Sequence, residues 1–338
     1  MCHFAAMCHF AATRRLAASA AAALALSALL AACGAPLPSP PQPAPAAAVL
    51  PSVDAGTSLL VVAPHPDDET LCCAGLMQRV LRAGGQVSVV WITSGDAERL
   101  YLLLNDKMLL PDAHAARRLG GTRMLEARAA ATLVGVPSAA QLFLGYPDGG
   151  LPALLYEHRA TPYTSPATYA DAVPYPDALF PGHPYTGESL ERDFAAVLAR
   201  VRPTLILAPS LLDQHPDHRA AGSLAIRASA RAGVHAALRY WIVHGGEGWP
   251  SPRGLLSGVP LTAPPAGREM VPGAFTLAPA EEDRKLLALR AHETQMRALA
   301  PFLLSFVRTT ELYYAAPQPR SPPRAALVRL SRAPCEGL

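Results

Sequence analysis

Uninterrupted apolar runs recur along this 338-residue chain, and a segment with helical spacing separates each run from the next. The runs that read as strands are residues 58–64, 86–93, 141–147, 204–210 and 238–244. A strand that is apolar on both sides is buried on both faces, which is typical of a parallel sheet covered by helices. The sequence therefore predicts an α/β fold, with a Rossmann-like, doubly wound, mainly parallel sheet and helices on both faces.

Helical spacing fills the intervals, and the last predicted helix is long and closes the domain. The predicted helices cover residues 70–85, 122–136, 189–201, 217–233 and 280–299. Two excursions, 99–121 and 155–186, interrupt the alternation. The second contains five tyrosines and six prolines without periodicity. Such a segment is typical either of a lid or binding loop or of an inserted surface loop.

The N-terminal segment has the layout of an export signal. Arg14 and Arg15 precede an apolar run that is too short for a transmembrane helix, and small residues lead to Cys33. "LAAC", residues 30–33, resembles the bacterial lipobox, in which the cysteine is lipidated. We therefore predict a signal peptide over 1–33 and a protein that is exported and lipid-anchored to a bacterial cell membrane, on its periplasmic or extracellular face. The alternatives are a buried alanine-rich helix and a plain signal that is cleaved nearby.

Composition divides the remainder of the chain. Residues 34–52 are rich in proline and alanine and predict an extended linker, 53–315 form the predicted catalytic domain, and 316–338 form a Pro/Arg-rich tail. The hexapeptide "MCHFAA" occurs at 1–6 and again at 7–12, so the true start codon stays open.

Charge and cysteine usage exclude other classes of protein. The formal net charge is +3 and no basic stripe is present, so nucleic acid is not an expected partner. Within the domain, Cys72 and Cys73 are adjacent, and we expect them not to pair with each other. The domain must therefore rely on a hydrophobic core rather than on a disulfide framework.

Polar clusters follow the predicted strands directly. "HPDDE" (65–69) follows the first, "SGD" (94–96) the second, "YPDGG" (146–150) the third and "LLDQHPDH" (211–218) the fourth. Because ligands bind beyond the carboxyl ends of strands in such a sheet, these clusters predict one functional site along that edge.

Two of these clusters have the spacing of metal ligands. His65 and Asp68 are three residues apart around a proline, and His215 and His218 repeat that spacing. Two histidines with one carboxylate and an open position form a catalytic metal layout that suits Zn²⁺, and also Fe²⁺. Either pair alone is more often a helix cap or a surface pair. Together, at the ends of two strands, they favour a metal site.

These motifs also carry a family resemblance. "PHPDDE", "TSGD", "LGYPDGGL", "DQHPDHRAA" and "AHETQ" stand in the order found in the PIG-L/LmbE family of zinc-dependent N-acetylglucosaminyl deacetylases, and the chain resembles that family over about 58–300. One departure is Pro64, where the family usually has alanine.

The resemblance implies roles for the clustered residues. It makes His65, Asp68 and His218 the metal ligands and Asp67 the general base that deprotonates the attacking water. His215 would stabilise the oxyanion or protonate the leaving amine. Amide hydrolysis needs each of these functions.

Further residues follow from the same comparison. Arg123 and Asp148 would contact sugar hydroxyls, and Asp96 is a third candidate for that role. The alternatives are a solvated helix residue for Arg123 and a turn former for Asp148. Asp213 and Asp217 would lie behind the ligands and orient their imidazoles.

The sequence thus predicts a membrane-tethered hydrolase that removes an N-acetyl group from an N-acetylglucosamine-type amino-sugar or glycan. One alternative is hydrolysis of another amide or acyl substrate on the same fold. Another is a non-catalytic sugar-binding lipoprotein. The oligomeric state is not predicted. For two residues near these motifs, Glu69 is either a helix cap or catalytic, and His292 is expected to be structural.

Overall fold

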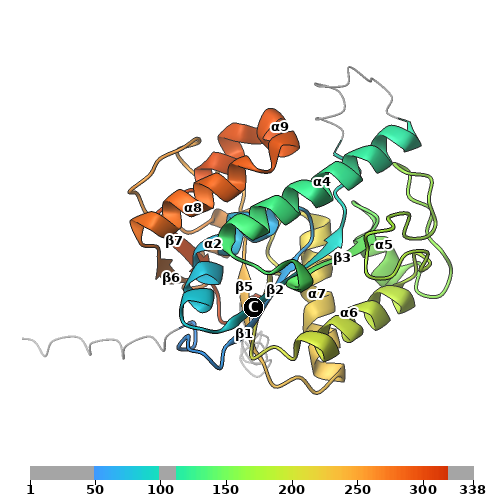
Figure 1. The fold of residues 1–338 in the computed structure, drawn as a ribbon, viewed down its shortest axis with the longest axis horizontal. Coiled ribbons are helices and arrows are strands. Elements are labelled where there is room, and N and C mark those ends of the chain that lie inside the picture. The colour runs from blue at the N-terminus through green and yellow to red at the C-terminus, as the bar shows by residue number, and fades with distance from the viewer. Residues whose placement is uncertain (1–48, 99–111, 319–338) are drawn as a thin grey trace, which may run out of the picture. The chain divides into compact units, whose positions relative to one another are not determined.

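The computed structural model describes residues 49–98 and 112–318 (Figure 1). Its main sheet has the order β3-β2-β1-β4-β5, and every neighbouring pair is parallel. The strands are β1 (Ser58–Ala63), β2 (Gln86–Thr93), β3 (Gln141–Tyr146), β4 (Leu205–Pro209) and β5 (Ala237–Trp241). Leu59 to Ala63 are wholly buried, as the apolar run predicts. The predicted parallel α/β fold is confirmed.

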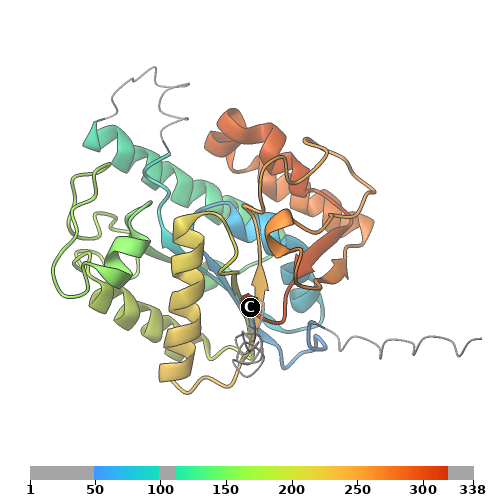
Figure 2. The ribbon, with the colours of Figure 1, turned by 180° about the vertical axis from the view of Figure 1, so that it is seen from behind.

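Helices cover both faces of this sheet, as the front and back views show (Figures 1 and 2). On one face lie α2 (Asp68–Arg82), α4 (Ala113–Val134), α8 (Pro279–Arg290) and α9 (Glu293–Leu303). On the other lie α5 (Leu151–Tyr156), α6 (Gly187–Val201) and α7 (Pro216–Arg231). A small antiparallel sheet pairs β6 (Gly273–Thr276) with β7 (Thr310–Tyr313). Within the described ranges, no helix has the length and apolar character that crossing a bilayer requires.

The strand order reverses at β1. The chain builds outward from β1 to β2 and β3, then returns to place β4 on the opposite side of β1. The segments that leave β1 and β4 therefore diverge and open a crevice at their carboxyl ends. "HPDDE" leaves β1 and "LLDQHPDH" leaves β4, so the topology brings the two motifs together.

Helix α4 begins earlier than its pattern predicts. The excursion predicted over 99–121 is helical from Ala113 onward, and its residues 99–111 lie outside the described ranges. Asp112 caps the helix, since its side chain accepts a hydrogen bond from the Ala115 amide at 2.7 Å. Gly120 lies inside this helix, where a Cβ would overlap the Tyr175 hydroxyl. The glycine therefore permits close packing and does not end the helix.

The prediction of one helix over 280–299 is wrong. Two helices, α8 and α9, meet at His292, whose φ of −80° and ψ of 62° are not helical. The break follows from a tertiary contact: the His292 ring is buried against Glu69, more than two hundred residues away. The spacing of apolar residues along the sequence carries no information about such a contact.

Cys72 and Cys73 form a disulfide in α2, so the expectation that they do not pair is wrong.

The tyrosine-rich segment 155–186 is an insertion that packs against the domain. Tyr175 and Tyr185 are buried, and their hydroxyls donate hydrogen bonds to Asp96 and to the Gly145 carbonyl, respectively. None of the segment's residues lines the cavity described below, which favours the surface-loop interpretation.

Candidate active site

Three side-chain atoms at the crevice form a nearly equilateral triangle. Asp68 Oδ2 lies 3.3 Å from His65 Nδ1 and 3.2 Å from His218 Nε2, and the two nitrogens are 3.3 Å apart. A tetrahedral Zn²⁺ with ligand bonds of 2.0–2.1 Å holds its ligand atoms about 3.3 Å from one another. The triangle therefore has the size and chemistry that a divalent metal requires.

The backbone positions these candidate ligands. His65 follows β1, and its amide donates to Asp68 Oδ2 at 2.9 Å, so the turn holds both ligands in one orientation. In the second motif, His215 caps α7, with Nδ1 accepting from the Asp217 amide at 3.2 Å. Pro216 occupies the first helical position, where its missing N–H costs nothing. His218 then points from the first turn of α7 into the crevice.

Asp213 lies against Nδ1 of His218, the ring nitrogen that points away from the triangle. One of its oxygens is 3.2 Å from His218 Nδ1 and accepts from the Val243 and His244 amides at 2.8 and 3.0 Å. Burial lowers the pKa of His218, but the carboxylates of Asp213 and Asp68 outweigh it and raise the pKa to about 9. Asp213 therefore orients the imidazole and concentrates negative charge beside it.

Asp217 has the corresponding place behind His65. Its Oδ2 is 3.2 Å from His65 Nε2 and accepts from the Gly149 amide at 2.7 Å, and Oδ1 accepts from the Leu151 amide at 3.1 Å. The Asp217 carboxylate thus connects α7 with the segment after β3 and with His65. It holds the segment after β3 against the metal triangle.

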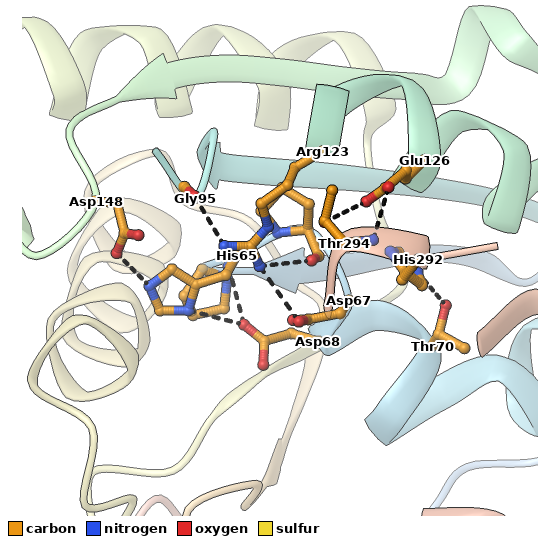
Figure 3. Close-up of polar contacts among 12 residues, drawn as sticks. His65, Asp67, Asp68, Thr70, Gly95, Arg123, Glu126, Asp148, His292 and Thr294 are labelled. Carbon is orange, nitrogen blue, oxygen red and sulfur yellow. Dashed lines mark hydrogen bonds and ion pairs between the residues drawn. The ribbon is translucent and has the colours of Figure 1, made fainter. Parts of the chain in front are cut away.

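Asp67 stands beside the triangle in a conformation that L-residues rarely adopt, with φ of 139°. Its carboxylate lies 3.2 Å from Arg123 Nη2 (Figure 3). Burial raises the pKa of Asp67 to about 7, although the Arg123 guanidinium opposes the shift. A buried carboxylate with such a pKa is suited to general-base work near neutral pH. Strained backbone of this kind persists where the surroundings impose it.

Glu69 provides that support. It is completely buried and accepts from the Asp67 amide at 3.1 Å, Trp91 Nε1 at 2.8 Å and Thr70 Oγ1 at 2.5 Å. His292 Nε2 lies 3.1 Å from Glu69 Oε1, the same oxygen that accepts from Thr70. Glu69 and His292 therefore form a buried pair beneath Asp67, which is consistent with the structural role expected for His292.

Two predicted substrate contacts, Arg123 and Asp148, line the cavity. Arg123 donates to the Gly95 and Pro66 carbonyls, both at 2.9 Å, and a Cβ at Gly95 would overlap the guanidinium. Asp148 Oδ1 lies 3.2 Å from His65 Nε2 (Figure 3). The hydrogen bonds of Arg123 thus hold Asp67 and the turn that carries it, while Asp148 lies at the edge of the cavity.

The third predicted contact, Asp96, is placed differently. It is fully buried and does not line the cavity. Its oxygens accept from the Tyr175 hydroxyl at 2.6 Å and the Asp148 amide at 3.3 Å. The structure therefore assigns Asp96 a supporting contact to Asp148.

A cavity of about 330 Å³ opens over the triangle. It is lined in part by residues that the sequence argument did not select: His244, which follows β5, and Gln295, Leu299, Phe302 and Leu303 of α9. His244 obeys the rule that selected the other clusters, because it stands just beyond a strand end. The α9 residues carry no such signal, since their apolar spacing matches that of any packed helix.

A buried two-histidine, one-carboxylate donor set beside a strained aspartate defines a metal-dependent hydrolytic site at the topological switch point of a parallel sheet. The family model for GlcNAc-PI de-N-acetylase, PIG-L, matches residues 60–229, which is 170 of the 338 residues. The chain belongs to the PIG-L family.

Relatives with assigned names agree with this membership. The chain is 29% identical to a 1D-myo-inositol 2-acetamido-2-deoxy-alpha-D-glucopyranoside deacetylase of Tsukamurella paurometabola, over 74% of this chain and 86% of that protein. It is 27% identical to the protein of the same name from Kribbella flavida, over 72% and 84%. Both of these relatives are thus named as deacetylases of an acetamido sugar.

Two solved structures are also similar to this chain. N,N'-diacetylchitobiose deacetylase from Pyrococcus horikoshii is 19% identical, with a TM-score of 0.46, over 75% of this chain and 82% of that chain. A conserved protein from Thermus thermophilus is 22% identical, with a TM-score of 0.46, over 82% and 100%.

Proposed function

We propose that this protein is a zinc-dependent deacetylase that hydrolyses the N-acetyl group of an N-acetylglucosamine-type amino-sugar, releasing acetate and a free amine. The observation that carries the proposal is the triangle of His65, Asp68 and His218 atoms with Asp67 beside it. The relatives' named activity on an acetamido sugar supports the choice of substrate.

His65, Asp68 and His218 would hold the Zn²⁺, which would supply a Lewis acid for the amide oxygen and would lower the pKa of a bound water. Asp67 accepts the proton of the attacking water, and Arg123 holds its carboxylate in place. Asp148, at the edge of the cavity, can accept a hydrogen bond from a sugar hydroxyl.

His215 has a defined tautomer. Burial, together with the charges on His65 and His218, lowers the pKa of His215 to about 3, so the ring is neutral. Its Nδ1 accepts the Asp217 amide and therefore carries no proton, which leaves the proton on Nε2. A neutral N–H donor at the cavity favours stabilisation of the developing oxyanion.

The test measures metal content and acetate release on the purified full chain, with N-acetylglucosamine and chito-oligosaccharides as substrates. We expect near-stoichiometric zinc and acetate release in the parent, and loss of both in His218→Ala, because removal of one ligand dismantles the site. His235→Ala, at an exposed histidine, is the matched control and should retain both. Metal without acetate from any such substrate would favour the sugar-binding alternative. Equal zinc in His218→Ala and the parent would contradict the ligand assignment.

We also propose that the domain is exported and anchored by a lipid on Cys33. Residues 1–48, which include the predicted signal and most of the linker, lie outside the described residues, so the support is the sequence of residues 13–33 alone. In a bacterial host fed a clickable fatty acid, we expect the parent and Cys335→Ala to become labelled and Cys33→Ala to remain unlabelled. Label on Cys33→Ala would contradict the anchor.

A further inference from the structure

The cavity has two chemically different sides. On the side of β2 and β3 it is lined by Glu98, Arg123, Asp148 and Gly149. On the other side it is lined by Leu71, Val243, Leu299, Phe302 and Leu303. The sheet order places β3 and β5 at opposite edges, with the metal triangle on the central strands between them. Asp148 and Val243, which follow β3 and β5, therefore lie on opposite sides of the metal triangle.

The apolar side begins at the metal ligands. The His244 ring centroid lies 4.8 Å from that of His218 and 5.8 Å from that of Phe302. Leu71 lies one helical turn beyond Asp68. The apolar wall is here defined as Leu71, Val243, Leu299, Phe302 and Leu303, and His244 and Gln295 are the polar residues that line the cavity beside it.

Helix α9 forms the outer part of this wall. Its first turn is tied to α4, where Thr294 donates to Glu126 from its amide and its hydroxyl at 2.8 and 2.6 Å. The helix is kinked at Leu299, with φ of −129°, two residues before Pro301. Leu299 and Phe302 are only partly buried, although they stand next to a strongly polar site. Their apolar surface is therefore open to the cavity.

A scissile amide must present its two substituents to these two sides. The amino-sugar is attached through nitrogen and the acyl group through the carbonyl carbon, so in an extended trans amide they point in opposite directions. The hydroxyl-rich sugar matches the polar side, which leaves the acyl group on the apolar side. An acetyl group places there only one methyl.

We propose that the apolar wall is an acyl-chain subsite, and that the preferred substrates are N-acyl amino-sugars with a chain longer than acetyl. This inference rests on the proposed function. The reaction is unchanged: water adds to the carbonyl carbon, the C–N bond breaks, and the carboxylic acid and the free amine leave.

The experiment compares N-acetyl-, N-butyryl- and N-hexanoyl-glucosamine by release of the free amine from the full-length, zinc-loaded protein. Burial of each methylene raises kcat/KM by about fourfold, so we expect the two additional methylenes to give an increase of about 16-fold from acetyl to butyryl. Leu299→Trp should remove this preference by filling the subsite. Leu287→Trp, at an exposed leucine of α8 outside the cavity, should keep it.

A binding measurement separates this inference from the proposed function. Calorimetry compares acetate with hexanoate, the two carboxylate products. Hexanoate has four more methylenes, so we expect it to bind about 250-fold more tightly than acetate in the parent but not in Leu299→Trp. Hydrolysis of the acetyl substrate with no gain for longer chains would overturn the subsite and leave the deacetylase intact. Absence of any hydrolysis, with hexanoate still preferred, would overturn the deacetylase and support the subsite. Equal binding of the two carboxylates would overturn the subsite.

Discussion

Replacing Asp67 with asparagine is expected to lower the rate of acetate release by about 10²–10⁴-fold, the usual contribution of a positioned general base. Asparagine keeps the shape and the cavity position of the side chain but does not accept a proton. The ligands His65, Asp68 and His218 are untouched, so the zinc content should stay at the parent level. Steady-state kinetics and metal analysis on the same preparation measure the two quantities.

The pH profile gives this prediction a second readout. A base works in its deprotonated form, so the rate falls as the pH drops through the pKa of Asp67. That pKa is about 7 without a metal, and a neighbouring dication lowers it, so the acid limb should lie below pH 7. We expect the limb to vanish in Asp67→Asn and to persist in Asp177→Asn, which alters an exposed carboxylate. An unchanged limb in Asp67→Asn would assign the base to another residue.

The second large effect concerns the stability of the fold. It involves a buried ion pair whose two side chains contact the backbone of α2. Lys285 Nζ lies 2.9 Å from Glu311 Oε1, and both side chains are about 1% exposed. The Glu311 oxygens accept from the Gly75 and Leu76 amides at 2.8 and 3.0 Å. Lys285 also donates to the Leu71 carbonyl at 2.8 Å.

Tyr313 completes this network. Its hydroxyl group contacts the Cys72 carbonyl at 3.1 Å and Glu311 Oε2 at 2.9 Å. The carbonyls of residues 71 and 72 and the amides of residues 75 and 76 are the groups that an α-helix pairs with one another. Side chains from α8 and β7 therefore support the turn of α2 that follows the ligand Asp68.

Lys285→Met is expected to lower the free energy of unfolding by about 3–5 kcal/mol, because it leaves the Glu311 carboxylate buried without its counter-charge. Urea denaturation measures the effect as a lower midpoint with an unchanged slope. Arg284→Met, at the exposed neighbouring position, should stay within about 0.5 kcal/mol of the parent. The double variant Lys285→Met/Glu311→Gln should recover part of the loss. A midpoint in Lys285→Met equal to that of Arg284→Met would show that the pair does not stabilise the fold.

The sequence was sufficient to predict the sheet and the edge that carries the site. A buried strand is recognisable in the sequence as a run of apolar residues, and β1 and β2 begin at the predicted residues 58 and 86. Since polar clusters after parallel strands share one edge, the pairing of the His65 and His218 motifs followed without knowledge of distances. The same rule applied to β5 would also have selected His244.

Other features depended on contacts that no local pattern contains. The break between α8 and α9, the support of Asp67 by Glu69 and His292, and the burial of Asp96 each join segments far apart in the chain.

The sequence by itself thus determined the fold class and the edge of the sheet where the candidate site lies, because periodicity and strand-end polarity are properties of neighbouring residues. Only the tertiary structure decided which groups touch. It closed the ligand triangle across about 150 residues of chain, fixed the strained backbone of Asp67 and set α9 over one side of the cavity. The physical reason is that burial and hydrogen bonding depend on what packs against a residue, and that partner comes from elsewhere in the chain.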